Sequence, residues 1–347
     1  MKRLLLTGIS GSIGSHTLAH IMHNTDWEVV GIASFRHKGW PERIEEVTKD
    51  HPDWKDRLTL FTHDLTAPFS PLLEKRIGKI DYIINMASLS DVEASIVDPV
   101  PFVKNNVDLV LNVLEYARKA KPEAFIQIST DEVYGPVEDK TSPGVKEWGV
   151  IAPSNPYAAS KAAQEAIAFS YWRTYDVPVI ITNTMNNFGE MQQASKFPAM
   201  IQNWVSKGEK VTIHGEERDG VIEIGSRSYI HSRNFADALI FILKNLPPHL
   251  HTPDAADRPD RYNIAGDRQL DNLELAKLIA NLMGKPDFEH EVVNVHTQRP
   301  GHDRHYALDP TKLKELGWES PIDFETSLKN TIKWQSQHAE WMEKYDD

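Results

Sequence analysis

The sequence predicts an α/β fold in which a doubly wound parallel sheet is joined to a smaller, mixed α/β C-terminal lobe. Short, almost continuously apolar runs recur through the first half of the chain, and helical patterns separate several of them. Runs of this kind indicate strands that are buried on both faces of a parallel sheet. A glycine-rich turn follows the first run, as expected where a strand leads into a helix.

The elements of the sheet can be placed in order. The first run begins at Lys2 in "KRLLLTGISGSIGSHTLAHIM", where apolar residues after the glycines follow a helical spacing. The later strand runs are "WEVVGIAS", "LTLFTHDL", "DYIINMAS", "AFIQIST" and "VPVIITNT". The clearest helices are predicted at 97–118 and 155–175. Ligands of such sheets bind beyond the C-terminal ends of the strands.

The alternation weakens after about Asn183. The segment "GEERDGVIEIGSRS" is typical of a loop or hairpin, and "YIHSRNFADALIFILKNL" indicates a return to the sheet. We therefore expect residues 1–182 and about 228–265 to form the first domain. Residues 183–227 and about 266–347 are expected to form the second lobe.

Charge and composition exclude several classes of partner. The 347 residues include 50 acidic and 38 basic ones, and the net charge of −12 argues against nucleic acid or an anionic membrane surface as a partner. The chain has no cysteine, which excludes a thiolate metal site, and we predict no metal site. The sequence shows neither the pattern of a secretory leader peptide nor an apolar run of membrane-spanning length, so a cytoplasmic location is expected.

The glycine turn has the spacing of a dinucleotide-binding site. Gly8, Gly11 and Gly14 follow a strand and open a helix, and Ser12 and Ile13 lie between them. Such glycines let the backbone approach a pyrophosphate at a helix N-terminus. The same spacing also occurs in a simple tight turn. A kinase-like P-loop is excluded because no Gly-Lys-Ser/Thr ending follows.

The end of the second strand bears on the cofactor. NAD-dependent sheets usually place an acid there to hold the ribose 2′-hydroxyl, but this chain has Ala33 and Ser34, followed by Arg36. A cation at this place favours the 2′-phosphate of NADP. The alternative is that Arg36 is a solvated loop residue, so NADP is favoured and NAD remains open.

Two further motifs suit proton transfer. Tyr157 and Lys161 are four residues apart, so that a helix places them on one face, where an ammonium favours the phenolate. Asp131 and Glu132 follow the fifth strand run directly. Adjacent acids can divide into an acid and a base if their surroundings separate their pKa values. Each motif also has a purely structural explanation. Tyr157 and Lys161 could be neighbours on the surface of a helix, and Asp131 and Glu132 could be a helix cap and a solvated charge.

Taken in order, "TGISGSIG", "NMAS", "STDEVYG" and "YAASK" resemble the extended short-chain dehydrogenase/reductase family. The resemblance covers nearly the whole chain and is strongest to nucleotide-sugar 4,6-dehydratases of the dTDP-glucose type. The motifs "NNFG", "YNIAGD" and "RPGHDRHYALDPTKLKELGW" add to it. It implies a Rossmann domain, a tightly bound NADP or NAD, and a nucleoside-diphosphate hexose as substrate.

The resemblance also implies roles for the motif residues. Tyr157 would take the proton of the sugar 4-hydroxyl while hydride leaves C4, with Lys161 beside it. Glu132 would then remove the C5 proton, and a protonated Asp131 would donate to the departing 6-hydroxyl. Thr130 would hydrogen-bond near the 4-oxygen.

Other positions match binding residues of the family. The implied cofactor-binding residues are Gly8, Gly11, Ser12, Ile13, Gly14, Ser34, Arg36, Asp64, Leu65, Ala87, Asn106, Tyr157 and Lys161. The implied substrate-binding residues are Ser90, Asn187, Arg227, Asn272, Arg299 and His302. The helices at 97–118 and 155–175 correspond to those that form a four-helix dimer interface in related enzymes, so a homodimer is expected.

Departures from the family leave the substrate open. Leu89, Asp91 and Ala94 replace an acid, a histidine and an arginine of the family motif after the fourth strand. Ala199 and Met200 replace a Glu-Lys pair near the expected diphosphate. UDP, GDP and CDP sugars therefore remain possible beside dTDP sugars. The rival functions are a 4-epimerase or another enzyme of the 4-keto intermediate, and a non-catalytic nucleotide sensor.

Overall fold

The computed structural model describes residues 1–218, 220–294 and 303–343. Its largest feature within these ranges is a seven-stranded sheet in which every neighbouring pair is parallel. In spatial order the strands are β11 (Asp260–Ile264), β6 (Val179–Thr184), β5 (Ala124–Thr130), β4 (Tyr82–Asn85), β1 (Arg3–Thr7), β2 (Glu28–Ala33) and β3 (Leu58–Thr62). The parallel sheet predicted from the apolar runs is confirmed.

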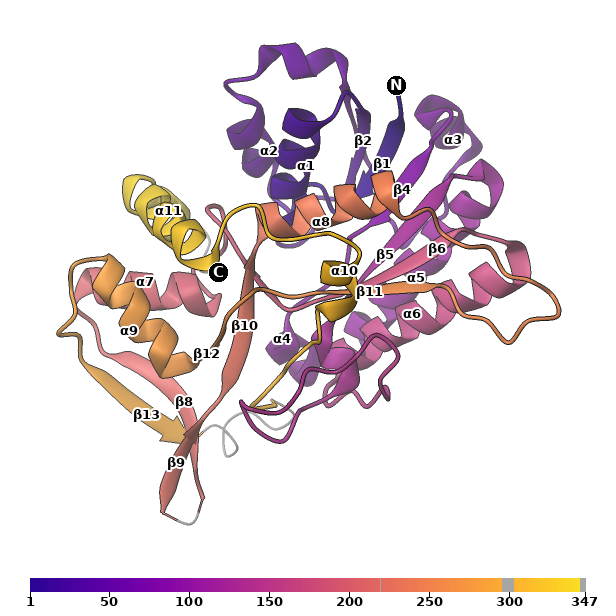
Figure 1. The fold of residues 1–347 in the computed structure, drawn as a ribbon. Helices are drawn as coiled ribbons and strands as arrows, with labels where there is room; N and C mark the ends of the chain where they lie inside the picture. Colours follow the sequence, from indigo (N-terminus) through magenta and orange to yellow (C-terminus); the bar gives the residue numbers. More distant parts are fainter. Residues whose placement is uncertain (219, 295–302, 344–347) are drawn as a thin grey trace.

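Helices cover both faces of this sheet because successive strand residues point to opposite sides. In β1, Leu4 and Leu6 belong to one apolar core and Leu5 to another. The first core faces α1 (Ser12–Asn24) and α8 (Ser232–Asn245), with α2 (Pro41–Thr48) packed on α1. The second faces α3 (Pro71–Ile77), α5 (Pro99–Ala120) and α6 (Pro156–Tyr175). Figure 1 shows α5 and α6 side by side, away from α1 and α8.

Two small mixed sheets form the rest of the molecule. One has the order β12 (Gln269–Asp271), β10 (Ser226–His231), β7 (Asn186–Phe188), and the other has β13 (His290–Asn294), β8 (Val211–Arg218), β9 (Val221–Ile224). The antiparallel pairing of β8 with β9 confirms the hairpin predicted in the glycine-rich segment.

Helices pack on these small sheets around a third apolar core. They are α7 (Phe197–Lys207), α9 (Asn272–Leu282) and α11 (Phe324–Gln337). In Figure 1 this part lies to the left of the large sheet. The exact domain boundaries stay a prediction.

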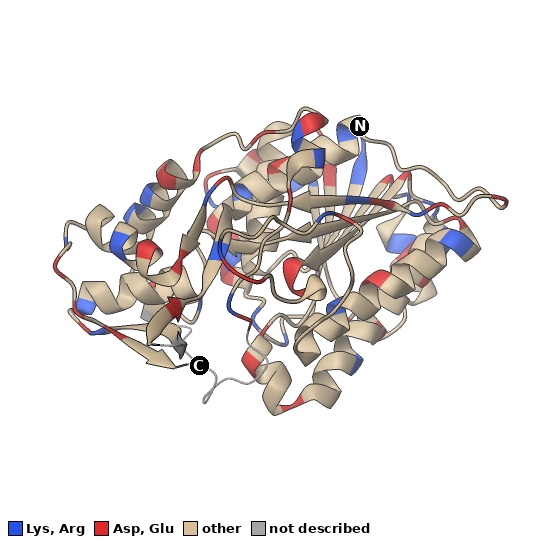
Figure 2. Cartoon of the chain, turned by 60° about the horizontal axis from the view of Figure 1, so that its bottom comes forward, with Lys and Arg blue, Asp and Glu red and all other residues tan. Residues whose placement is uncertain are grey.

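The remaining elements are short. They are α4 (Val92–Val97), α10 (Thr311–Glu315), α12 (Glu340–Glu343) and the 3-10 helices η1 (Pro52–Asp56) and η2 (Asp131–Tyr134). Basic and acidic residues are interspersed along the ribbon in Figure 2. No described helix is long and apolar enough to cross a membrane.

Candidate active site

The glycine turn between β1 and α1 is tight enough to require its glycines. Gly8 has φ +70°, and a Cβ atom there would lie 3.0 Å from the backbone nitrogen of Ala87. At Gly14 a Cβ atom would come within 2.1 Å of the Gly8 carbonyl oxygen. The glycines thus let the start of α1 pack closely on the end of β1 and on the loop after β4, and a side chain at either position would push these segments apart.

The first residues of α1 complete this turn. Gly11 is the N-cap residue without a side-chain cap, and Ser12 and Ile13 begin the helix. Their N–H groups lie among those that a helix leaves without an intrahelical partner. The sequence-predicted cofactor turn therefore offers backbone donors at a helix N-terminus, which are groups that can bind a phosphate.

The segment after β2, which is expected to contact the cofactor ribose, differs from the sequence-based expectation because its cation, Arg36, is paired with an acid. Arg36 Nη1 lies 2.8 Å from Asp64 Oδ2, and Arg36 Nη2 donates to Asn105 Oδ1 at 3.3 Å. The guanidinium thus already has an acidic partner, Asp64, which is the second residue after β3. Ser34 follows β2 directly and its Oγ accepts from the Arg36 N–H at 3.5 Å, while Leu65 is buried.

Asn106 fastens the loop after β4 to α6. Its Oδ1 accepts from the Leu89 N–H at 2.8 Å, and its Nδ2 donates to Ser160 Oγ at 2.8 Å. Ala87 is the second residue of this loop, and its N–H donates to Thr7 Oγ1 at 3.1 Å. The hydrogen bonds of these two residues therefore join the end of β1, the loop after β4 and the helix that contains Tyr157.

The two acids follow β5 in η2, as predicted. Thr130, the last residue of β5, donates from Oγ1 to Asp131 Oδ1 at 2.9 Å. The other carboxyl oxygen of Asp131 is buried and has no hydrogen-bond partner among the described residues. Burial, and then the charge of Glu132, raises the pKa of Asp131 to about 7. Near neutral pH this group can therefore hold a proton to donate.

Two side chains that the sequence did not reveal lie beside Glu132. Asn155 Nδ2 donates to Glu132 Oε2 at 3.2 Å. The Tyr306 hydroxyl lies 3.5 Å from the same oxygen and donates to Asp303 Oδ2 at 2.8 Å. Burial raises the pKa of Glu132, while the hydrogen bond from Asn155 and the charge of Arg227 act in the opposite direction. The hydrogen bond from Asn155 and the charge of Arg227 favour an ionised Glu132 beside a protonated Asp131.

Tyr157 and Lys161 lie on the first turns of α6, next to the acids. Burial raises the pKa of Tyr157, Glu132 raises it further, and a hydrogen bond with Thr130 acts against the shift. Lys161 Nζ donates to the Ile128 carbonyl oxygen and to Gln164 Oε1, both at 2.7 Å, and burial lowers its pKa to about 7.

A line of buried polar side chains connects the glycine turn with Lys161. Thr7 Oγ1 donates to Asn85 Oδ1 at 2.8 Å, and Asn85 Nδ2 donates to Gln127 Oε1 at 2.9 Å. Gln127 Nε2 donates in turn to Gln164 Oε1 at 3.2 Å, the atom that also accepts from Lys161. The ends of β1 and β4, the middle of β5 and the helix α6 are thereby linked by hydrogen bonds.

The sequence-predicted substrate residues fall into two groups. Arg227 is nearly buried, with its guanidinium 4.4 Å from the Tyr306 ring centre, and its charge acts on both acids. Asn187 donates to Thr184 Oγ1 at 3.1 Å, and its Oδ1 is buried and unpartnered among the described residues. These two residues lie on β10 and β7, neighbours in one small sheet.

The other substrate residues are less informative. Asn272 begins α9, after the N-cap Asp271, and its N–H donates to the Gly225 carbonyl oxygen at 3.0 Å. Ser90 is exposed in the loop after β4. Arg299 and His302 lie outside the described residues.

Lys196, at the start of α7, is a further residue that sequence reasoning missed. Burial lowers its pKa, and the charges that act on it come from Asp91, Lys38 and Glu132. The "SNPY" capping pattern could have drawn attention to Asn155, but no local pattern reveals that Lys196 or Tyr306 faces the acids.

The fold and these residues define a class: a dinucleotide-binding α/β enzyme in which paired acids lie beside a tyrosine and a lysine. Comparison with known proteins identifies the family within this class. A family model described as GDP-mannose 4,6 dehydratase matches residues 5–331. The chain belongs to this family.

Individual relatives agree. The dTDP-glucose 4,6-dehydratase of Escherichia coli is 30% identical, over 99% of this chain and 96% of its own length. The low-salt glycan biosynthesis protein Agl12 of Haloferax volcanii is 32% identical, over 95% of this chain and 97% of its own. The crystal structure of DesIV, the dTDP-glucose 4,6-dehydratase of Streptomyces venezuelae, with NAD and TYD bound, has a TM-score of 0.83 at 27% identity and covers 99% of both chains. The chain is thus an enzyme of the nucleotide-sugar 4,6-dehydratase type, a hydro-lyase.

Proposed function

We propose that this enzyme removes water across C5 and C6 of a nucleoside-diphosphate hexose to give a 4-keto-6-deoxy sugar. The observation that supports this most is the pair of acids after β5. The pKa of Asp131 is raised to about 7, while Glu132 receives a hydrogen bond from Asn155. An enzyme that only epimerises C4 needs no proton donor at C6.

The first step is oxidation at C4. A nicotinamide dinucleotide, when bound, supplies the hydride acceptor for this step, the hydride donor for C6, and a positive ring charge. Tyr157 accepts the proton of the 4-hydroxyl, for which it needs positive charge nearby, because its own surroundings raise its pKa. Lys161 lies one helical turn further along α6 and can supply that charge when protonated.

The second step is elimination. The 4-ketone acidifies the proton on C5, and Glu132 removes it as general base. Asp131 gives its proton to the 6-hydroxyl, which leaves as water. Thr130 hydrogen-bonds to Asp131 and lies within reach of Tyr157, so it can orient both. The net change is the loss of one water, with no net oxidation of the sugar.

For the cofactor we propose NAD in tightly bound form. The glycine turn suits a dinucleotide, because it ends in the N–H groups at the start of α1, where a phosphate can bind. The expectation of NADP rested on Arg36, whose guanidinium is paired with Asp64. Solved relatives such as the DesIV dehydratase are described with NAD. Both points favour NAD over NADP.

For the substrate we propose a dTDP-hexose first, because the curated relatives include several dTDP-glucose 4,6-dehydratases. Arg227 and Asn187 would hold its nucleotide part, with Asn272, Ser90, Arg299 and His302 as further candidates. The replacements at Leu89, Asp91, Ala94, Ala199 and Met200 keep UDP, GDP and CDP sugars as alternatives.

A homodimer through α5 and α6, and a cytoplasmic location, stay predictions. These two helices pack on each other along their length. Exposed apolar side chains lie near the start of α5, at Val97, the last residue of α4, and at Val100 in the first turn of α5. Light scattering that gives the mass of a single chain at working concentration would exclude the dimer.

Incubation with dTDP-, UDP-, GDP- and CDP-hexoses, followed by mass spectrometry, tests the reaction. We expect one substrate to lose one water, and expect Asp131→Asn and Glu132→Gln to suppress the loss. Sugar 4-epimerases share this fold. Inversion at C4 with unchanged mass would therefore contradict the proposal and support an epimerase.

A further inference from the structure

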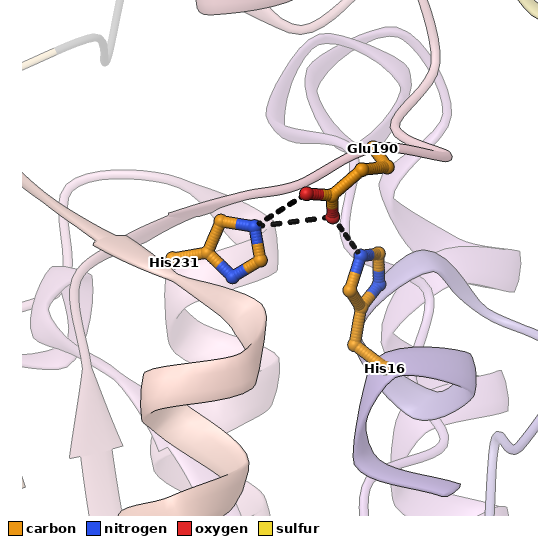
Figure 3. Close-up of side chains that lie close together, drawn as sticks. All are labelled: His16, Glu190 and His231. Carbon is orange, nitrogen blue, oxygen red and sulfur yellow. Dashed lines mark hydrogen bonds and ion pairs between the residues drawn. The ribbon is translucent and has the colours of Figure 1, made fainter. Parts of the chain in front are cut away.

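Three buried or partly buried side chains from separate elements meet beside the cofactor helix. His16 lies on α1, Glu190 follows β7, and His231 ends β10. Glu190 Oε2 is 2.8 Å from His16 Nε2 and 3.1 Å from His231 Nε2 (Figure 3). Two histidines and a carboxylate can hold either a metal ion or a proton, and the remaining hydrogen bonds decide between these.

The partners of His16 require it to carry two protons. Its Nδ1 lies 2.7 Å from the Ser12 carbonyl oxygen, which can only accept, so Nδ1 bears a hydrogen. Its Nε2 faces Glu190. Burial alone would raise the pKa of Glu190. The hydrogen bonds from His16 and His231 outweigh burial and hold this pKa well below its usual range. The carboxylate therefore also accepts, and His16 is an imidazolium.

The partners of His231 argue against a metal ion. The backbone N–H of Arg233 donates to His231 Nδ1 at 3.0 Å, because His231 is the N-cap residue of α8. Nδ1 thus has the free electron pair and Nε2 has the hydrogen. A metal ligand needs the opposite arrangement at Nε2. Burial lowers the pKa of His231, in keeping with a neutral ring.

The surrounding groups support this assignment. Thr331 Oγ1, on α11, donates to Glu190 Oε1 at 3.4 Å, and Gln335 Nε2 donates to the Glu190 carbonyl oxygen at 3.1 Å. The charged side chains nearby are Arg233, which acts on both His231 and Glu190, and Arg43 of α2, which donates to the Met191 carbonyl oxygen at 3.0 Å. The cluster itself is neutral, with one positive and one negative member.

The cluster connects the two parts of the active site. His16 lies in the helix that begins at the glycine turn. Glu190 is three residues beyond Asn187, and His231 is at the opposite end of β10 from Arg227. Gly189 allows the close approach, since a Cβ atom there would lie 2.8 Å from His16 Nε2. A single carboxylate thus ties the cofactor helix to both strands that hold candidate substrate residues.

We propose that His16, Glu190 and His231 are positioning residues, in which a protonated His16 and an ionised Glu190 keep the nucleotide-sugar strands β7 and β10 aligned with the cofactor helix. The proposal rests on the proposed function for its substrate side only. Loss of the Glu190 charge should weaken the binding of both the cofactor and the nucleotide, and it should leave Asp131 and Glu132 in η2 in place.

The test compares Glu190→Gln and His16→Gln with wild type in binding assays that need no turnover. We expect dTDP or UDP to bind roughly tenfold more weakly to both variants and NAD to dissociate faster, while kcat changes less than KM. His20→Gln is the matched control. His20 lies on the same helix and pairs with Asp237 of α8 at 3.0 Å, but does not contact Glu190 in the described structure.

Nitrogen-15 NMR of the histidine-labelled wild type tests the proton assignment without any variant. We expect the signals of a histidine with both ring nitrogens protonated that are present in wild type and absent from both His16→Gln and Glu190→Gln. One equivalent of bound transition metal, removed by a chelator together with activity, would overturn the assignment. So would unchanged dTDP, UDP and NAD binding in both variants. Failure of wild type to bind dTDP or UDP would instead count against the proposed substrate class, since the NMR and NAD measurements stand without it.

Discussion

Replacing Asp131 with asparagine should suppress dehydration and at the same time stabilise the protein at neutral and higher pH. The pKa of this carboxyl is raised from 3.8 to about 7 by burial and by Glu132. Between these two values the native state holds a proton that the unfolded chain has lost. The free energy of unfolding therefore falls as the pH rises through this window, and the decline ends above about pH 7.

The size of the effect follows from the shift. Each pKa unit corresponds to ~1.4 kcal/mol, so the shift of Asp131 amounts to roughly 4 kcal/mol as an upper limit for the stability lost on ionisation. Asparagine does not ionise, and its Oδ1 can still accept from Thr130. The variant should thus gain most of this energy above about pH 7 and little of it near pH 4. Removal of a general acid should slow the reaction ~10²–10⁴-fold.

Urea unfolding at several pH values between about 5 and 8 measures this difference directly, with both proteins in the same cofactor-loaded state. Asp56→Asn, at an exposed position in η1, controls for the substitution itself. The stability gap between the Asp131 variant and wild type should widen as the pH rises, and wild-type kcat should fall above about pH 7. A gap that stays constant over this range would refute the raised pKa and, with it, the acid role.

Three further changes test the rest of the site. Tyr157→Phe should lower kcat at least ~10²-fold, because C4 oxidation loses its proton acceptor, and thermal unfolding should show that the fold is kept; ordinary turnover in this variant would exclude the assigned role. Gly14→Ala should abolish NAD retention, since its Cβ would overlap the Gly8 carbonyl oxygen, and co-purified NAD measured by absorbance would reveal a contrary result. Arg36→Ser should leave NAD affinity within about threefold, because the guanidinium is already paired with Asp64; a larger loss in titration calorimetry would show that Arg36 holds the cofactor.

Local patterns were sufficient for six of the seven strands of the large sheet, all but β11, and for the placement of the paired acids and of Tyr157 with Lys161. The run "AFIQIST" is apolar enough to be a buried strand, and it places Asp131 and Glu132 at a strand end wherever the rest of the chain lies. The spacing of Tyr157 and Lys161 likewise fixes their common helix face. Such features depend only on neighbouring residues.

Contacts between distant segments were not predictable in this way. Tyr306 meets Glu132 across 174 positions, and Arg36 meets Asp64 through the pairing of β2 with β3. Neither contact leaves a periodic trace in the sequence. For the same reason Arg36 suggested NADP, since a cation can be read from the sequence and its partner cannot.

The line of buried polar side chains from Thr7 to Lys161 limits which substitutions the protein can accept at these positions. Each donor along it points at the next acceptor, from Thr7 through Asn85 and Gln127 to Gln164. Changing one member alone leaves a buried donor or acceptor unsatisfied, at a cost of ~1–3 kcal/mol, whereas a coordinated change of several members can avoid it. Substitutions at these positions should therefore occur in coordinated sets or be rare. A mutant library that varies the positions one at a time will miss the combinations that preserve the fold.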